Sequence, residues 1–131
     1  MYHITDSQNI KKIKKFGLDP EFSKTGDGIY YSQDESHASA YEDHHGDWHS
    51  GTLLRIKLLK FDNKLLGADD ADYPDIVGED YDESDWKDSL QKSGKCIYSG
   101  IIKSKDIEFL SENGKWKKLI IEKEKTFKPS I

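Results

Sequence analysis

The spacing of hydrophobic and polar residues alternates along this chain between the two-residue period of strands and the longer period of helices. Residues 2–5 have the pattern of a first strand, and the apolar positions Ile10, Ile13 and Phe16 then recur at helical spacing up to Gly17. A glycine directly after the last apolar position is typical of a helix C-terminus. The pattern therefore predicts a strand and then one short amphipathic helix, whose lysine-rich face points to solvent.

A second strand-to-helix transition follows after a polar loop. The β-branched and aromatic run at residues 29–31 predicts a strand, residues 32–34 offer helix N-caps, and residues 35–41 predict a helix. Tyr30 on the strand and Tyr41 on the helix would then flank one slot. They are either half-buried packing residues or the two walls of a site for a flat ring.

The second half of the chain is dominated by the strand pattern. The expected strands there are residues 52–59, 64–66, 96–102, 106–110 and 115–121. Asn113-Gly114 separates the last two and predicts a type I′ hairpin turn, while residues 84–92 predict a short helix with Trp86 and Leu90 facing inward. Together the patterns predict an α+β fold of five to seven strands and two or three short helices, in a single domain over residues 1–131.

An acidic segment interrupts this strand-rich half. Ten of the twenty residues from Asp69 to Asp88 are Asp or Glu, and aromatic residues are interleaved with them. The aromatic residues favour an ordered surface insertion, at about residues 67–92, over a disordered tract. Such a segment can repel phosphate, mimic it, or bind a basic partner. The charged C-terminal residues, about 122–131, are expected to fray.

Composition and charge narrow the classes of function. The net charge of −5 argues against salt-driven binding of nucleic acid by the whole surface, although the charge is unevenly distributed. No apolar run is long enough to cross a membrane, and no segment reads as a signal peptide. The single cysteine, Cys96, fits a reducing compartment. We therefore expect a cytoplasmic protein without a membrane partner.

The sequence also lacks the common catalytic signatures. It has no glycine-rich nucleotide fingerprint, no phosphate-binding loop and no nucleophile elbow, and Cys96 lies mid-strand, where a buried inert thiol is expected. His44, His45 and His49 fall in one polar loop together with two aspartates. Because their spacing matches no zinc motif, we expect a polar loop bordering a pocket and no metal.

His3-Ile4-Thr5 on the first strand and Gly17-Leu18 after the first helix form a distinctive opening. They resemble the His-x-Ser/Thr strand and the "GL" turn of the ADP-ribosyltransferase fold. The tRNA 2′-phosphotransferase family shares both features. The arginine-rich site of that second family is not matched, because Arg55 is the only arginine in the chain.

Two further stretches extend the likeness. Residues 28–32, with Tyr41 eleven residues after Tyr30, resemble a segment of the poly(ADP-ribose) polymerases at the same spacing. Residues 52–56 resemble the central strand that follows, so the likeness covers about residues 2–60. It implies an ADP-ribosyltransferase-like α+β fold with split mixed or antiparallel β-sheets and a few short helices.

The resemblance implies a role for each matching residue. His3 would hydrogen-bond the adenosine-side ribose of NAD, the backbone of Ile4 would bind the nicotinamide amide, and Thr5 would support the loop. Tyr30 and Tyr41 would sandwich the nicotinamide ring. His3 and Tyr30 would be the catalytic pair. The implied NAD-contacting set is His3, Ile4, Thr5, Tyr30, Tyr31, Ser32 and Tyr41.

Two positions depart from the family pattern. The family usually has a glutamate at the start of a late strand, and residues 93–98 here contain no acidic residue. Gln91 is the nearest polar candidate for its place, with Glu83 and Asp85 further back in the acidic segment, and Arg55 is the second candidate polar assistant. Ala38 stands where the family has a serine that binds the nicotinamide amide.

The resemblance thus implies an NAD-dependent ADP-ribosyltransferase that modifies a protein or nucleic-acid target with one ADP-ribose and releases nicotinamide. Small stand-alone members of the fold act in bacterial toxin systems or phage–host conflict, which is an analogy. The absent glutamate favours an alternative, a catalytically inactive module that binds NAD or ADP-ribose, or inhibits a basic partner through its acidic surface. A plain α+β domain with an accidental likeness is the third interpretation.

Overall fold

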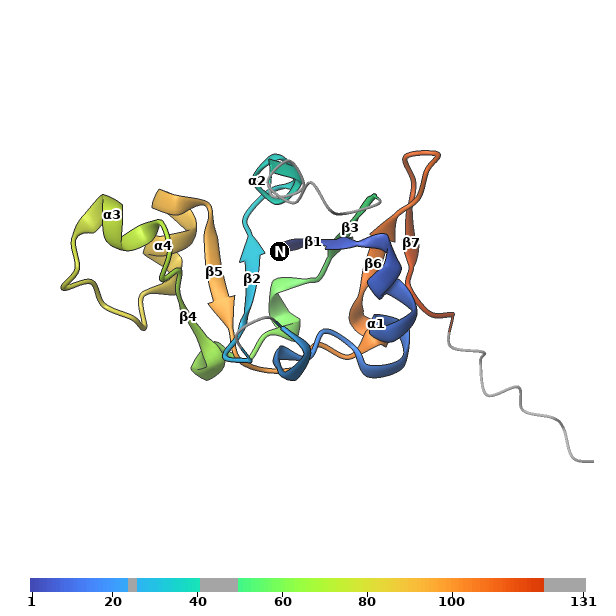
Figure 1. The fold of residues 1–131 in the computed structure, drawn as a ribbon, viewed down its shortest axis with the longest axis horizontal. Coiled ribbons are helices and arrows are strands. Elements are labelled where there is room, and N and C mark those ends of the chain that lie inside the picture. The colour runs from blue at the N-terminus through green and yellow to red at the C-terminus, as the bar shows by residue number, and fades with distance from the viewer. Residues whose placement is uncertain (24–25, 41–49, 122–131) are drawn as a thin grey trace, which may run out of the picture.

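The computed structural model describes residues 1–23, 26–40 and 50–121, with the backbone alone at Ala40. This part of the chain is α+β, with one seven-stranded antiparallel sheet and a few short helices (Figure 1). The strands are β1 (Tyr2–Asp6), β2 (Ile29–Ser32), β3 (Gly51–Arg55), β4 (Leu66–Ala68), β5 (Lys95–Tyr98), β6 (Glu108–Leu110) and β7 (Trp116–Lys118). The α-helices are α1 (Ile10–Phe16), α2 (Glu35–Ala40), α3 (Tyr73–Val77) and α4 (Trp86–Ser93).

The sheet has a weak link in its middle. Its strand order is β4-β5-β2-β1-β3-β6-β7. β1 pairs with β3 over five residues but meets β2 at a single register pair, Tyr2 with Ser32. In Figure 1, β1 runs across the direction of β2 instead of alongside it. The sheet therefore falls into two parts, β4-β5-β2 and β1-β3-β6-β7, which meet where the N-terminal strand begins.

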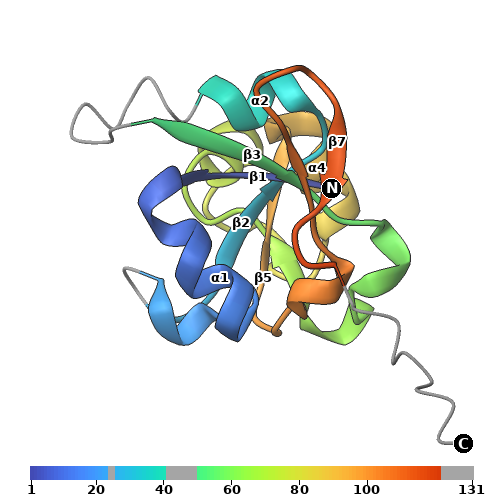
Figure 2. The same ribbon diagram turned by 90° about the vertical axis from the view of Figure 1, so that its right-hand side faces the viewer.

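Each face of the sheet carries a hydrophobic cluster, because successive strand residues point to opposite faces. The larger cluster includes Ile13 of α1 and Leu54 of β3. The smaller one contains Ile4, Leu53 and Ala38 of α2. Since Leu53 and Leu54 are neighbours on one strand, α1 and α2 cover opposite faces of the sheet (Figure 2).

Gly17 ends α1, as the sequence pattern predicts. Its backbone has a φ of 76° and its N–H donates to the carbonyl of Ile13 at 2.8 Å. A Cβ at this position would lie 2.2 Å from the carbonyl oxygen of Ile102, so both conformation and space require glycine. Leu18 and Ile102 then exchange two backbone hydrogen bonds of 2.9 and 3.0 Å. The Gly-Leu turn thus ties α1 to the segment after β5.

Four predicted strands are shorter in the structure than in the sequence pattern: the last two span only Glu108–Leu110 and Trp116–Lys118. The strand predicted at residues 64–66 lies two residues later, at Leu66–Ala68. The strand expected over residues 52–59 ends at Arg55, and residues Leu58–Lys60 form a 3-10 turn with both leucines exposed. An apolar run with solvent-facing leucines has no buried face to hold it in a strand. The strand expected over residues 96–102 ends at Tyr98.

The last hairpin uses a different turn from the predicted type I′. That turn needs positive φ at both central residues, and Gly114 alone has it here, with a φ of 79°. The Gly114 N–H donates to the Ser111 carbonyl at 2.9 Å, and the Ser111 N–H donates to the Lys115 carbonyl at 2.8 Å. These bonds describe a type I turn followed by a glycine bulge, which accommodates Asn113 at ordinary negative φ.

The acidic segment is ordered and contains two helices. Trp86 and Leu90 of α4 pack against the larger cluster, as predicted, whereas the pattern did not predict α3. Asp69, directly after β4, is fully buried, and its carboxylate accepts the backbone N–H groups of residues 71–73 at 2.9 to 3.1 Å. This carboxylate fixes the turn that leads into α3. Within the described ranges, no helix is long and apolar enough to span a membrane.

Candidate functional site

His3 bridges the two parts of the sheet where the β1–β2 pairing stops. Its Nδ1 lies 2.8 Å from the backbone carbonyl oxygen of Tyr30. Since a carbonyl oxygen only accepts, Nδ1 carries the proton and donates. Burial lowers the pKa of the His3 imidazole below its ordinary 6.5, so the ring is neutral at neutral pH and Nε2 is an acceptor. Among the residues that the structure describes, none donates a hydrogen bond to this Nε2.

Tyr31 supports the His3 ring from the core side. The two ring centroids are 5.5 Å apart, and Tyr31 meets Phe61 edge-on at 4.9 Å. The Tyr31 side chain is 0% exposed, and within the described part of the chain its hydroxyl has no hydrogen-bond partner. Burial raises the pKa of this phenol well above its ordinary value. Tyr31 is therefore placed to orient His3, and its own side chain does not reach the surface.

Tyr30 points to the other face of β2 and is only partly buried. Its hydroxyl donates to a carboxylate oxygen of Asp70, in the loop after β4. The ammonium of Lys95 lies 5.3 Å from the centroid of the Tyr30 ring. The ring thus has a carboxylate at its hydroxyl end and a cation beside its face.

Lys95 is a buried cation at the start of β5. Its side chain is 8% exposed, and its Nζ lies 2.7 Å from a carboxylate oxygen of Asp72 and 3.9 Å from one of Asp69. The hydroxyl of Ser89 on α4 accepts the Asp69 backbone N–H at 2.8 Å and donates to the Lys95 carbonyl at 2.7 Å. These contacts hold the start of the acidic segment against β5, beside Tyr30.

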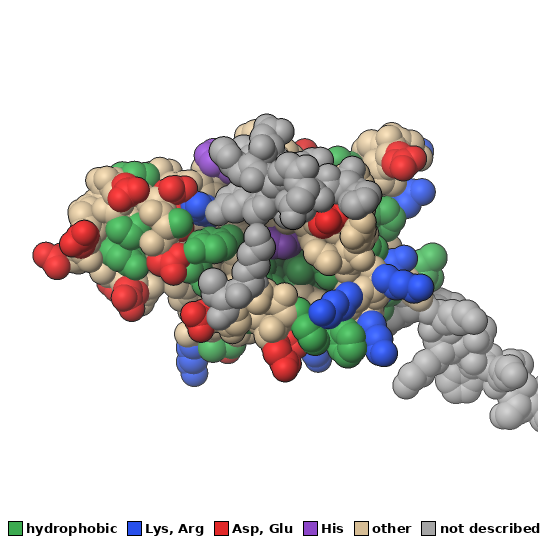
Figure 3. Space-filling model, in the orientation of Figure 1, with side chains coloured by type: hydrophobic (Ala, Val, Ile, Leu, Met, Phe, Trp, Pro, Cys, Tyr) green, Lys and Arg blue, Asp and Glu red, His purple; other side chains and the backbone are tan. Residues whose placement is uncertain are grey.

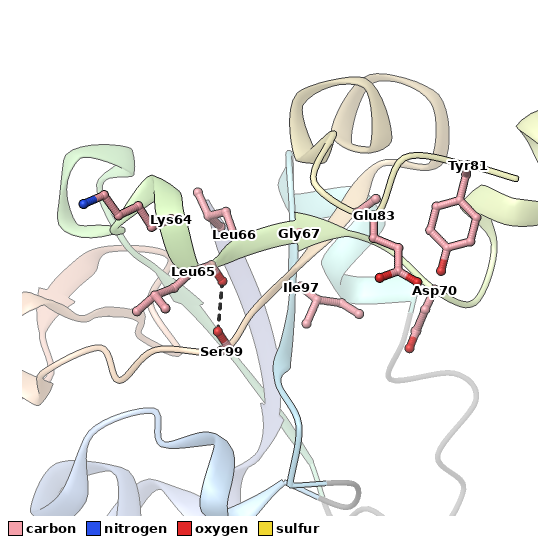
Figure 4. Close-up of a pocket in the computed structure, with 10 residues that line it drawn as sticks. Lys64, Leu65, Leu66, Gly67, Asp70, Tyr81, Glu83, Ile97 and Ser99 are labelled. Carbon is pink, nitrogen blue, oxygen red and sulfur yellow. Dashed lines mark hydrogen bonds between the residues drawn. The ribbon is translucent and has the colours of Figure 1, made fainter.

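A hollow of about 360 Å³ opens next to Asp70. Figure 4 shows Asp70, Tyr81 and Glu83 gathered at one end of it. Ile97 also lines the hollow and pairs with Tyr30 across β5 and β2, so both residues lie on the same face of the sheet. The volume is at the lower end of the range for small-molecule sites. The Asp70 carboxylate therefore belongs both to this hollow and to the surroundings of Tyr30.

The N-terminus of α2 is fixed beside the start of β5. The Asp34 carboxylate accepts the His37 backbone N–H and the His37 Nδ1, each at 2.8 Å, and these bonds lower the pKa of Asp34 to about 2. The Gln33 N–H donates to the Gly94 carbonyl at 2.9 Å. Gly94 has a φ of 81°, and a Cβ there would lie 2.3 Å from the His37 ring. Glycine at this position lets α2 approach the site.

Besides Tyr31, three predicted site residues, Ile4, Thr5 and Ser32, have buried side chains, and so does Ala38, which stands at the position of the family's serine. Ile4 and Ala38 pack together in the smaller cluster, and Ser32 lies at the end of β2. The Thr5 hydroxyl accepts the side-chain amide of Asn9 at 3.4 Å, which supports the turn after β1. Only the backbone of Ile4 is thus left for the role that the resemblance implies, and Ala38 offers no side-chain hydrogen bond.

The two predicted polar assistants lie elsewhere. Gln91 is exposed on α4. Arg55 lies on β3, with β1 between it and β2, and its Nε is 3.0 Å from the Glu108 carboxylate. Its guanidinium also lies 4.4 Å from the centroid of the Trp116 ring. Arg55 therefore braces β3 against β6 and β7, and its charge is already partnered.

Some predictions fall outside the described residues. Tyr41, the second wall of the predicted slot, is one of them, and so are His44, His45 and His49. The aromatic sandwich therefore stays a prediction. Within residues 1–23, 26–40 and 50–121, no group of three or more His, Cys, Asp or Glu side chains is arranged to hold a metal ion.

Sequence reasoning missed Asp70 and Lys95, the polar neighbours of Tyr30, and Asp72, the ion-pair partner of Lys95. They come together because β4 and β5 pair, with Gly67 opposite Ile97, although α3 and α4 separate these strands in the chain. The only sequence signal was the presence of two strand patterns on either side of the acidic segment. Their pairing could not be read from the pattern.

Comparisons with protein-family models, curated proteins and solved structures gave no match. A functional proposal therefore rests on the sequence motifs and on the geometry around His3 and Tyr30. That geometry offers a neutral imidazole with an acceptor nitrogen, bonded to the backbone of Tyr30, and a partly exposed Tyr30 ring whose hydroxyl is bonded to the Asp70 carboxylate.

Proposed function

We propose that this protein is an NAD-dependent ADP-ribosyltransferase that transfers one ADP-ribose to a protein or nucleic-acid acceptor. The observation that carries the proposal is the hydrogen bond between His3 and the Tyr30 carbonyl. It fixes a neutral imidazole with Nε2 as an acceptor, which suits a ribose hydroxyl. The Tyr30 ring, which points to the opposite face of β2 from Tyr31 and is partly exposed, suits the flat face of nicotinamide.

The finer fold assignment is part of the same proposal. The ADP-ribosyltransferase likeness implies split sheets, and the single register pair between β1 and β2 supports that division. His3 and Tyr30 come from these two strands. The proposal requires that the dinucleotide bind along this division, in contact with both parts of the sheet.

The reaction requires few groups from the protein. The C–N bond between ribose and nicotinamide breaks, its electron pair leaves with the nicotinamide ring, and the ribose C1′ becomes cationic. A nucleophile of the acceptor then forms the new bond to C1′ and gives up its proton to solvent. The residues of this chain bind and orient the dinucleotide, exclude water and stabilise the positive charge.

Asp70 is the group that we assign to charge stabilisation. Its carboxylate accepts the Tyr30 hydroxyl and lines the adjoining hollow. In NAD the positive charge lies on the nicotinamide ring, and it moves to the ribose C1′ as the C–N bond breaks. A carboxylate that faces C1′ would therefore stabilise the transition state more than the ground state. In this account, the acidic segment supplies the negative charge that the family's glutamate would provide at the start of β5.

One observation favours the inactive-module alternative. The first residue of β5, where the resemblance calls for a glutamate, is Lys95, and its buried ammonium is paired with Asp72. A cation beside the reacting ribose would oppose the developing positive charge. In that case the protein binds NAD or ADP-ribose without turnover, or its acidic surface occupies a basic partner.

Nicotinamide release from NAD separates the two functions. The protein is incubated with NAD, and free nicotinamide is measured by chromatography, while NAD binding is measured by calorimetry. The transferase predicts release that is lost in His3→Ala and Tyr30→Ala, and a fall in kcat with little change in KM for Asp70→Asn. Asp80→Asn, an exposed acid in the same segment, is the matched control and should keep the wild-type rate.

The outcomes distinguish the proposals. NAD binding without nicotinamide release supports the inactive module. Neither binding nor release, by a protein that folds normally, contradicts both and leaves the plain α+β domain. Equal losses in Asp70→Asn and Asp80→Asn would remove the special role given to Asp70.

A further inference from the structure

One exposed surface combines lysines with aromatic rings. It is formed by α1 and the adjoining 3-10 turn η2 (Pro20–Phe22), and we call it the lysine–phenylalanine surface. Its members are Lys11, Lys12, Lys14, Lys15, Phe16 and Phe22. All six are exposed, and the two phenylalanines are 45% and 46% exposed. Figure 3 shows basic side chains around hydrophobic ones in the region of α1, at the opposite end of the molecule from the acidic side chains over α3 and α4.

The aromatic rings on this surface are paired and held in place. The centroids of Phe16 and Phe22 are 5.2 Å apart. The Lys12 ammonium lies 4.0 Å from the Phe22 centroid, and the Lys15 ammonium lies 5.1 Å from the Phe16 centroid. The sequence pattern placed Phe16 on the buried face of α1 with Ile13, yet only Ile13 is buried. Two large rings thus stay in solvent next to positive charges, where single exposed apolar residues would need no explanation.

The positive charge of α1 is not balanced within the described part of the chain. None of its four lysines forms an ion pair there. Lys11 with Lys14, Lys11 with Lys15, and Lys12 with Lys15 stand three or four positions apart, where like charges repel by about 0.2–0.5 kcal/mol per pair. Asp19, the N-cap of η2, and Glu21 within it are the first acids after α1 in the sequence, and neither forms an ion pair with a lysine of α1 in the described residues. A bound polyanion would relieve this repulsion.

We infer that the lysine–phenylalanine surface binds single-stranded nucleic acid. Binding of single strands combines a basic track for the phosphates with aromatic side chains on which bases stack. The lysines provide the first and the exposed ring pair provides the second. Charge complementarity favours this occupant, because the four lysines form a basic surface on a chain whose overall net charge is −5. Binding of nucleic acid to this surface does not depend on the proposed transferase activity. If the bound nucleic acid is also the acceptor of ADP-ribose, that role rests on the proposed activity.

An anionic membrane is a weaker fit to the same residues. Helices that lie in a membrane surface insert a continuous apolar face. α1 is seven residues long, and Ile13 on its apolar side is buried in the larger cluster. The helix therefore has no free apolar face to insert, while the ring pair and the lysine side chains remain accessible.

Fluorescence anisotropy tests the inference without NAD. The probes are labelled single-stranded RNA and DNA of about 12 nucleotides, within the site sizes of single-strand binders. Contact of three or four lysines with phosphates predicts a 20- to 50-fold loss of affinity, roughly, between 50 and 200 mM salt. Lys11→Gln/Lys14→Gln should weaken binding and flatten the salt dependence. Phe22→Leu keeps an apolar side chain but removes the ring, and should weaken binding about tenfold.

Lys117→Gln/Lys118→Gln on β7 is the matched control, because it removes the same charge from an exposed site elsewhere. The inference requires that this pair bind like the wild type. No binding at 50 mM salt, equal losses in the two lysine pairs, or tighter binding to phosphatidylserine vesicles than to the oligonucleotides would overturn it. Nicotinamide release measured on the same preparations shows separately whether the proposed transferase activity holds.

Discussion

Asp69 joins the acidic segment to the sheet, so its removal gives the sharpest test of how that segment is held. The carboxylate is fully buried and accepts three backbone N–H groups, those of Ala71, Asp72 and Tyr73. It also lies 3.9 Å from the ammonium of Lys95. Asp69→Ala leaves the three N–H groups without their acceptor and removes one of the two carboxylates near a buried cation.

The expected magnitude follows from these contacts. Loss of a capping carboxylate costs about 0.5–2 kcal/mol. The Tyr73 N–H is buried and would lose its partner, which costs a further 1–3 kcal/mol, roughly. Asp72 still pairs with Lys95 at 2.7 Å, so the full penalty of an unpaired buried charge does not apply. We expect Asp69→Ala to lower the free energy of unfolding by about 3 kcal/mol.

Urea unfolding followed by tryptophan fluorescence measures this change, since Trp86 lies on α4 within the acidic segment. Asp80→Ala removes the same charge from an exposed position and should change the free energy of unfolding by less than about 0.5 kcal/mol. A loss below about 1 kcal/mol for Asp69→Ala, which is the low end for one buried unsatisfied group, would refute the reasoning. It would mean that the segment is not anchored through this carboxylate.

Four further predictions concern the site and the core. Burial lowers the pKa of His3, so below about pH 6.5 the unfolded chain binds more protons than the folded one, and the free energy of unfolding should fall. If His3→Gln left the slope of unfolding free energy against pH unchanged, this prediction would be contradicted. Tyr31→Phe should raise the free energy of unfolding by about 1 kcal/mol in urea titrations, because it removes a buried hydroxyl without a partner in the described residues. A lower free energy of unfolding would instead show that the Tyr31 hydroxyl forms a stabilising hydrogen bond. Burial raises the pKa of Cys96 to about 12, so a thiol reagent should label it only in urea that unfolds the protein, and fast labelling of the native state would argue against that burial. Arg55→Met should lower the free energy of unfolding by less than about 1 kcal/mol and leave nicotinamide release unchanged, whereas abolished release would give Arg55 the polar-assistant role.

Short-range patterns in the sequence were enough to predict the elements that carry the site. The strand at the N-terminus, the helix ending at Gly17, and the strand and helix around Tyr30 all occur where the spacing places them, as far as the structure describes them. Each depends on residues within one or two helical turns, so the local pattern contains the information.

Strand ends and long-range contacts were beyond the pattern. Leu58 and Leu59 continue an apolar run, but they are exposed, and only the tertiary structure decides that β3 stops before them. The neighbours of Tyr30 come from after β4 and from the start of β5, and two helices lie between these strands. Local sequence patterns do not reveal which strands pair when a long insertion separates them in the chain.

The exposure of Phe16 shows a different limit. Its spacing fits the apolar face of α1, and the same spacing puts it beside Lys12 and Lys15. Whether the ring turns toward the core or toward the neighbouring Phe22 depends on where η2 lies, which the helical period does not determine.

A structure of the protein with bound NAD tests the central claim most directly. The account predicts the nicotinamide ring against Tyr30, an adenosine ribose hydroxyl within hydrogen-bond distance of the Nε2 of His3, and the Asp70 carboxylate facing the ribose of nicotinamide. NAD bound away from the junction of β1 and β2, or its absence from crystals soaked with NAD, would contradict it.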